Sequence, residues 1–99
     1  PVVKIDIDPE YESDIQTAVQ LLKEKGCQEI YLFGSLATGK QRKNSDIDLA
    51  VKGLKKEFFF DILALLNRRL IHEIDLVLLD EKTPLTEYLE NSKEMKLVS

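Results

Sequence analysis

The sequence predicts an α/β domain in which helices pack on a small mixed β-sheet. Short apolar runs typical of strands alternate along the chain with longer segments whose apolar residues recur at helical spacing. The resulting order is strand, helix, strand, strand, helix, strand, helix, which fits a two-layer or mixed-sheet α/β architecture. No repeat, linker or low-complexity segment interrupts the chain, so we expect one domain over residues 1–99.

The first part of the chain predicts two strands with a helix between them. Residues 2–7 alternate apolar and polar side chains, as a strand with one buried face does. A helix is expected over residues 9–25, because its apolar residues fall at i, i+3, i+4 and i+7 and Gly26 provides a stop. Residues 30–33 form a short apolar run and predict the next strand.

The second part predicts two further strands, two helices and a short final strand. Residues 47–51 and 72–79 read as strands, and residues 55–70 read as a long helix with an apolar stripe. A Thr-Pro pair opens a helix over residues 83–92, because proline favours the first helical position. Residues 95–98 predict a short strand at the end.

Composition and charge limit the functions open to this chain. The formal net charge is −4 and the isoelectric point is near 5.0, which argues against a nucleic-acid binder held by a broad basic surface. The longest apolar runs are far shorter than a membrane span. Cys27 is the single cysteine, so no internal disulfide can form and a reducing cytoplasm is expected. His72 is the single histidine, and we expect neither a structural zinc site nor a chemical role for it.

Two aspartates stand in the strand predicted over residues 47–51 and at its start. Side chains alternate between the faces of a strand, so Asp46 and Asp48 share one face while Ile47 and Leu49 point into the core. Two neighbouring carboxylates repel each other, which raises a pKa or requires a cation. Mg²⁺ suits such a site, because it takes carboxylate oxygens together with substrate phosphates. An isolated Asp-x-Asp is more typical of a solvated strand face.

The turn after residues 30–33 supplies features suited to phosphate. Gly34 allows a sharp backbone turn and the close approach of a ligand. Ser35 is expected to cap a short helix over residues 36–38 that ends at Gly39. The start of such a helix presents free N–H groups and a partial positive charge. A Gly-Ser pair alone is typical of an ordinary turn, but the pair followed by Asp-x-Asp points to a phosphate and metal site.

The polar segment between these features carries the one local basic cluster of an acidic chain. Lys40, Arg42 and Lys43 lie in it, and Ser45 stands at its end beside Asp46. The segment is either a solvated loop or an element that meets the phosphates of a nucleotide or an acidic partner.

A third acidic residue, Asp75, interrupts the apolar run of residues 72–79. A buried carboxylate without a partner is costly, so we expect Asp75 to have one. The alternative is an edge-strand aspartate that faces water. Glu73 shares the face of Asp75 but lies at the strand entrance, and we rank it lower as a candidate.

The spacing from Gly34-Ser35 to Asp46-Ile47-Asp48 resembles the signature of the DNA polymerase β-like nucleotidyltransferase superfamily. The fuller string F-G-S-x-A-x-G…S-D-I-D-L-A-V is similar to its smallest branch, the minimal nucleotidyltransferase (MNT) domain proteins of prokaryotes, and the resemblance covers most of the chain. It implies the nucleotidyltransferase fold, with the carboxylates at one rim of a small mixed sheet.

The resemblance also implies a set of roles. Asp46 and Asp48 would hold two Mg²⁺ ions, and Asp75 would complete the second metal site and help to draw the proton from the attacking hydroxyl. Gly34 and Ser35 would hold the outgoing pyrophosphate of ATP. The nucleotide would be transferred to an acceptor hydroxyl by in-line attack, with the protein supplying positioning and charge neutralisation.

The resemblance implies a partner as well. Small MNT proteins are typically encoded beside a HEPN-domain protein, and the pair forms a toxin–antitoxin system in which the antitoxin transfers AMP from ATP to a tyrosine of the toxin. The alternatives are a binding module that neutralises its partner by contact and an antibiotic-modifying transferase. Leu36 and Thr38 stand at sites where many family members carry an arginine, a role that Lys40, Arg42 or Lys43 could take over.

Overall fold

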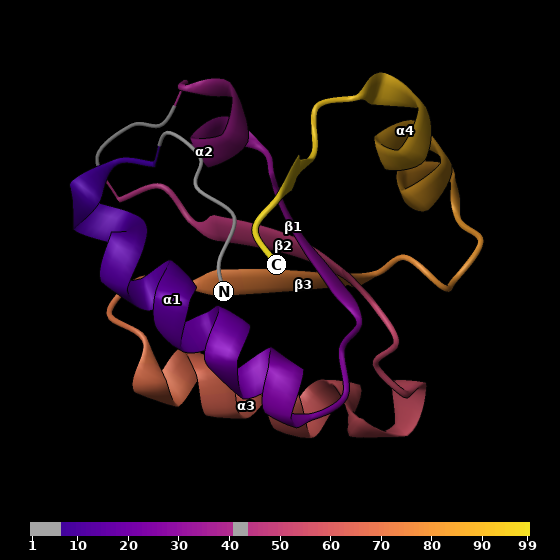
Figure 1. The fold of residues 1–99 in the computed structure, drawn as a ribbon, viewed down its shortest axis with the longest axis horizontal. Helices are drawn as coiled ribbons and strands as arrows, with labels where there is room; N and C mark the ends of the chain where they lie inside the picture. Colours follow the sequence, from indigo (N-terminus) through magenta and orange to yellow (C-terminus); the bar gives the residue numbers. More distant parts are fainter. Residues whose placement is uncertain (1–6, 41–43) are drawn as a thin grey trace.

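The computed structural model describes residues 7–40 and 44–99. Its strands form one mixed sheet in the order β3-β2-β1-β4, in which β1 is antiparallel to β2 and β4 while β2 and β3 are parallel (Figure 1). The predicted α/β architecture with a small mixed sheet is therefore confirmed. The elements follow in this order: α1 (Pro9–Glu24), β1 (Glu29–Phe33), α2 (Ser35–Thr38), β2 (Ile47–Lys52), the 3₁₀ helix η1 (Lys56–Phe58), α3 (Phe59–Arg69), β3 (Ile74–Leu78), α4 (Pro84–Ser92) and β4 (Lys96–Leu97).

Most predicted elements differ from the observed ones only at their ends. Two predicted elements need correction, and most of a third lies outside the described residues. The helix expected over residues 55–70 begins with η1, and the regular helix starts at Phe59. The strand expected over residues 72–79 starts only at Ile74, because His72 is bonded to a side chain of α1 instead of a neighbouring strand. Of the strand expected over residues 2–7, residues 2–6 lie outside the described part, and residue 7 is not in a strand.

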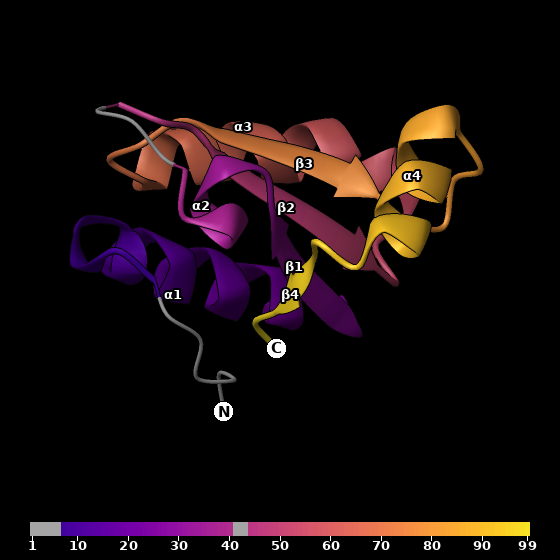
Figure 2. The same cartoon turned by 90° about the horizontal axis from the view of Figure 1, so that it is seen from above.

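One face of the sheet is covered by α1 and α3, which contribute their apolar stripes to the main core (Figures 1 and 2). Ile47, Leu49 and Val51 of β2 are fully buried there, as the alternation of the strand predicted. This burial fixes the other side chains of β2 on the opposite face. In the described residues, no helix is both long enough and apolar enough to cross a membrane.

On the opposite face, α4 covers one end of the sheet. Ala50 and Leu79 pack there with Leu89 of α4 in a second, smaller cluster. Figures 1 and 2 both show α4 far from α2, near the ends of β2 and β3. Asp48 and Asp75 lie two or more residues before this cluster on the same face, so α4 does not cover the start of the two parallel strands.

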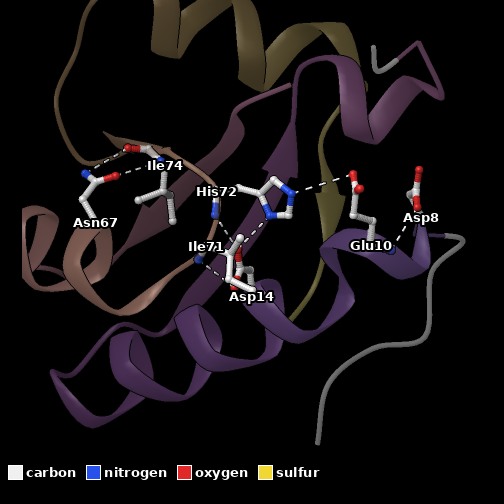
Figure 3. A network of polar contacts seen from close by, with 7 residues as sticks. All are labelled: Asp8, Glu10, Asp14, Asn67, Ile71, His72 and Ile74. Carbon is white, nitrogen blue, oxygen red and sulfur yellow. Dashed lines mark hydrogen bonds and ion pairs between the residues drawn. The ribbon is translucent and has the colours of Figure 1, made fainter. Parts of the chain in front are cut away.

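The segment that leads into β3 is held by polar side chains from two helices (Figure 3). The Asp14 carboxylate on α1 is buried and accepts hydrogen bonds from the backbone N–H groups of Ile71 at 3.2 Å and His72 at 2.8 Å. Its Oδ2 also lies 2.9 Å from Nδ1 of the His72 ring. On the other side, the Asn67 amide of α3 donates to the Ile74 carbonyl at 3.4 Å and accepts from the Ile74 N–H at 3.1 Å.

These bonds set the titration of Asp14. Burial alone would raise the pKa of this carboxyl, but the hydrogen bonds from the backbone and ring of His72 and from the backbone of Ile71, with the attraction of His72, outweigh burial and hold the pKa below its usual value. A carboxyl whose pKa is lowered by folding stabilises the fold above its unfolded pKa. That contribution is lost as the pH falls through the lower folded value.

We therefore expect Asp14→Asn to destabilise the protein at neutral pH by roughly 2–4 kcal/mol, because the amide cannot accept all three bonds and leaves buried donors unpaired. The stability difference from the wild type should narrow as the pH falls below about 4, where Asp14 of the unfolded wild type takes up a proton, and should narrow further as the pH falls through the lower pKa of the folded state. Urea unfolding at pH 7, 4 and 3 measures this, with Glu12→Gln as an exposed control on the same helix. A difference that stays constant from pH 7 to pH 3 would contradict the assignment.

Candidate active site

Parallel pairing of β2 and β3 brings the predicted carboxylates together. The register places Asp48 opposite Asp75, and Asp46 directly precedes β2 on the face of Asp48. Asp46 and Asp75 are exposed, while Asp48 is half-buried. Asp75 lies on the edge strand and is exposed to solvent. The expectation that Asp75 is buried is therefore wrong, and the alternative of an edge-strand aspartate that faces water agrees with the structure.

Burial and neighbouring negative charge both disfavour the charged form of Asp48. Burial, then the charge of Asp75 and then that of Asp46 raise the pKa of Asp48 to about 6. The fold thus carries a carboxylate that is costly to ionise in the absence of a cation. A bound divalent ion would reverse this by favouring the charged form.

The glycine turn after β1 lies directly against Asp48. Gly34 has a φ of 73°, a left-handed conformation that side chains rarely adopt. A Cβ atom at Gly34 would overlap Asp48 Oδ2 and lie 3.2 Å from Asp48 Cγ. The β1–α2 turn can approach the carboxylate this closely only because residue 34 has no side chain. The start of α2, with N–H groups that have no partner inside the helix, is thereby placed beside Asp48.

The predicted capping role of Ser35 is wrong. Gly34 is the N-cap residue of α2, no side chain caps this end, and Ser35 is the first helical residue. The close contact with Asp48 explains the difference, because only glycine fits at position 34, which is the capping position. The predicted stop at Gly39 is confirmed, because Gly39 ends α2 in the left-handed conformation.

The predicted basic cluster is only partly described. Lys40 is exposed just beyond the end of α2, whereas Arg42 and Lys43 lie outside the described residues. Of the two sites where an arginine is common in the family, Leu36 is buried in the core and Thr38 is exposed. The Thr38 hydroxyl bonds back to the Gly34 carbonyl at 3.3 Å.

A hollow of about 300 Å³ lies beside the carboxylates, where the segments that enter β2 and β3 run next to each other. Polar groups make up most of its lining. Six residues line it: Asn44, Ser45, Asp46, Ile71, His72 and Glu73. Ser45 is half-buried at its wall and stands next to Asp46.

His72, for which the sequence predicted no chemical role, has contacts with α1 that the sequence analysis did not predict. It lines the hollow, its ring lies 4.1 Å from the ring of Tyr11, and its Nε2 is 3.8 Å from the Glu10 carboxylate (Figure 3). A signal for this arrangement was present on α1. Tyr11, Asp14, Ile15 and Ala18 fall at i, i+3, i+4 and i+7, so Asp14 occupies a position of the buried stripe and needs a buried partner.

The donors for a metal are present but do not form a complete cage. In residues 7–40 and 44–99, no group of three or more His, Cys, Asp or Glu side chains is arranged to hold an ion on its own. The chemistry of the donor set nevertheless fits Mg²⁺, which is usually bound by one or two carboxylates, waters and substrate phosphates. Burial, and then the neighbouring charges of Asp75 and Asp46, raise the pKa of Asp48, and a bound cation would offset both effects.

The fold carries carboxylates on two adjacent strands and a glycine turn against them. These features define a class of transferases that act on phosphate groups, and comparison with known protein families agrees. The family model described as "Polymerase beta, Nucleotidyltransferase" matches residues 11–98. This protein belongs to that nucleotidyltransferase family. The resemblance inferred from the sequence is thereby confirmed, together with the fold that it implied.

Solved structures of toxin–antitoxin complexes are similar to this chain. One, described as a toxin–antitoxin with AMP-PNP, shares 31% identity at a TM-score of 0.68, covering 87% of this chain and 70% of the other. A mutant of the toxin–antitoxin MntA-HpeT shares 28% identity at a TM-score of 0.69, covering 86% and 71%. A complex of tri-AMPylated Shewanella oneidensis HEPN toxin with MNT antitoxin has the same fold at 24% identity and a TM-score of 0.64, covering 87% and 69%. No curated protein sequence matches the chain.

Gly34 and Gly39 have the same left-handed backbone conformation. Substituting each of them therefore distinguishes the cost of backbone strain from the cost of the contact with Asp48. Gly34 and Gly39 have φ values of 73° and 74°, but a Cβ at Gly39 would meet nothing within 4 Å. Gly39→Ala should cost about 1–2 kcal/mol of stability from backbone strain alone. Gly34→Ala should cost clearly more, because the methyl group must also displace the Asp48 carboxylate. Urea unfolding of both variants measures the difference, and equal losses would contradict the close contact.

Neutralising Asp48 should stabilise the metal-free protein. Its raised pKa means that the folded state binds more protons than the unfolded state between about pH 4 and pH 6, so wild-type stability should fall as the pH rises through this range. Asp48→Asn should remove that fall and raise Tm by a few degrees at pH 7.5 in the presence of a chelator. Thermal unfolding from pH 4 to pH 8 tests this. Asp61→Asn, at an exposed site on α3, should leave the pH dependence unchanged, and a lower Tm for Asp48→Asn would show that Asp48 is structural.

Proposed function

We propose that this protein is a Mg²⁺-dependent nucleotidyltransferase that transfers AMP from ATP to a tyrosine hydroxyl of a HEPN-type toxin, and so acts as its antitoxin in the cytoplasm. The observation that carries the proposal is the Gly34 turn packed on Asp48, opposite Asp75. It joins a phosphate-binding backbone to a carboxylate cluster. Family membership supports the reaction class. The similar complexes with AMP-PNP and with an AMPylated HEPN toxin support the donor and the acceptor.

In this mechanism each residue has a role that follows from its position in the site. Asp46 and Asp48, with Asp75, would hold the metal, which would supply charge neutralisation when bound. Ser35 and the backbone after Gly34 bind the outgoing pyrophosphate. The acceptor oxygen forms a bond to the α-phosphorus as the bond from that phosphorus to pyrophosphate breaks. The hydroxyl proton passes to Asp75, which is exposed at the edge where an acceptor can reach it.

The basic segment supplies the remaining contacts to the nucleotide in this proposal. Leu36 is buried and cannot replace the arginine found at that site in many family members. Lys40, Arg42 and Lys43 take over this role as phosphate ligands, and Ser45 contributes its hydroxyl next to Asp46. These are the contacts expected of an anion site that depends on a loop after a short helix.

Asp46→Asn should lower AMP transfer by at least roughly 10²–10³-fold, the order of loss when one preorganised electrostatic element is removed. Asp75→Asn should act similarly. The assay incubates the protein with labelled ATP, Mg²⁺ and the neighbouring HEPN protein and follows the mass of the partner tyrosine. Omission of Mg²⁺ should abolish transfer in the wild type.

Asp61→Asn is the matched control and should transfer AMP at the wild-type rate, because it lies on the exposed side of α3. Binding to the partner should persist in Asp46→Asn, since the site is a small part of any contact surface. If that variant still neutralises the partner stoichiometrically without an adduct, catalysis is not the mechanism. The protein would then neutralise the toxin by contact.

A further inference from the structure

The outer edge of β3 has backbone groups that the sheet does not use. At the start of the strand, the Glu73 carbonyl accepts a hydrogen bond from the Ile47 N–H of β2 at 2.8 Å. At its end, the Leu79 N–H donates to the Val51 carbonyl of β2 at 2.8 Å. Alternate residues from 73 to 79 therefore bond to β2 in this parallel ladder. The N–H and carbonyl groups of the residues between them point away from the sheet.

Both ends of this edge are occupied, and its middle is open. At the start of β3, the Asn67 amide bonds to both outward groups of Ile74, accepting from the N–H at 3.1 Å and donating to the carbonyl at 3.4 Å (Figure 3). At the end, the Leu78 carbonyl accepts from the Glu81 N–H at 3.1 Å. Among the described residues, none bonds to the outward groups of Leu76 or to the Leu78 N–H. Such groups on an edge strand can pair with another chain.

The flank of α3 beside this edge carries an exposed aromatic side chain. Figures 1 and 2 show α3 lying along β3. Asn67 reaches Ile74 from this flank, and Lys56 in η1 pairs with Glu81, just after β3, at 3.1 Å. Phe60 lies between these two contacts, seven residues or about two turns before Asn67, so it is on the same flank. Phe60 is 78% exposed, which leaves an aromatic ring uncovered beside the open part of the edge.

The open edge and the Phe60 flank together suit an extended polypeptide. A strand added beside β3 would bond to the backbone of Leu76 and Leu78, while its alternate side chains would face α3 and pack on Phe60 and the half-buried Leu63. Leu76 contributes only its backbone, since its side chain is in the main core. A helix could not use these groups, because its own N–H and carbonyl groups are bonded internally.

The position of this edge favours a partner protein over a second copy of this chain. Asp75 is exposed on β3, and paired strands lie about 4.8 Å apart, so an added strand brings a partner next to the carboxylates of the site. A second copy would carry the same occupied ends. In an antiparallel pair centred on the open stretch, Asn67 of each copy would meet the turn after β3 of the other.

We propose that the outer edge of β3 and the Phe60 flank of α3 form the docking surface for an extended segment of the partner protein, which adds a strand beside β3. The proposal rests on the HEPN partner proposed above and adds the surface that binds it. Leu76 and Leu78 supply backbone hydrogen bonds, and Phe60 supplies the apolar contact. None of these three residues belongs to the proposed catalytic, metal or nucleotide groups, so docking and transfer can be tested separately.

Amide hydrogen exchange, followed by NMR, tests the backbone contacts. In the free protein, the N–H groups of Leu76 and Leu78 should exchange at least about 10-fold faster than that of Leu79, which bonds to β2. Addition of the neighbouring HEPN protein should slow both by at least about 10-fold, while the amides of β4, at the opposite edge, stay unchanged. Slow exchange in the free protein, or unchanged exchange with the HEPN protein present, would overturn the proposal.

Truncation of Phe60 gives a second, independent readout. Phe60→Ala should weaken binding of the HEPN protein at least about 10-fold, raise its KM in the transfer assay to match, and leave the KM for ATP unchanged. Tyr88→Ala, the same truncation at an exposed aromatic residue on α4, is the matched control and should bind like the wild type. Thermal unfolding checks that both variants are folded. Wild-type affinity for Phe60→Ala, or an equal loss for Tyr88→Ala, would contradict the docking surface.

Sedimentation of the protein alone tests the other occupant of the edge. The wild type should sediment as a monomer, because its own β3 is a poor partner for itself. A dimer that Phe60→Ala dissociates would place a second copy on this edge and refute the proposal.

These readouts separate the docking surface from the function on which it rests. If AMP is transferred to the HEPN protein while Leu76 and Leu78 stay unprotected and Phe60→Ala keeps the wild-type KM, the transferase stands and the docking surface is refuted. If the HEPN protein protects both amides and needs Phe60 but receives no AMP, the docking surface stands and the proposed transfer is wrong.

Discussion

The parallel register between β2 and β3 is the constraint on which the site depends. It sets Asp48 opposite Asp75, a pairing of like charges that side-chain interactions alone would disfavour. The core on the other face enforces it, because Ile47, Leu49 and Leu76 are all buried and a slip by one residue would turn them toward solvent. Hydrophobic burial on one face of the sheet thus keeps two repelling carboxylates together on the other face. Functional sites usually retain unfavourable electrostatic interactions in this way.

The same register would be of little use if the chain before β3 were loosely held. Asp14 and Asn67 fix that segment from α1 and α3, and they do so through backbone N–H and carbonyl groups rather than through side-chain packing. Such bonds are directional, so they define where β3 starts and how the hollow is shaped. The helices that build the main core therefore also position the wall of the hollow.

The sequence predicted the sheet well and the shared face of two carboxylates, because both depend on local patterns. Alternation along β2 identified the shared face of Asp46 and Asp48, and the apolar frame around Asp75 marked it as unusual. The Ser35 cap was wrong because a contact across the sheet, between Gly34 and Asp48, decides which residue caps α2. The contact of His72 with Asp14 was not predicted, because the two residues are 58 positions apart in the chain and no local pattern joins them.

These differences follow from what holds each side of the site. The turn after β1 is shaped by backbone, so it requires a residue without a side chain at position 34 and leaves a spacing that can be read in the sequence. The hollow is shaped by side chains that contact one another across the fold, and several combinations of residues could build an equivalent wall. A sequence motif therefore reports the reaction class, which depends on the backbone and the carboxylates. Long-range contacts such as that of Asp14 with His72 become visible only in the folded structure.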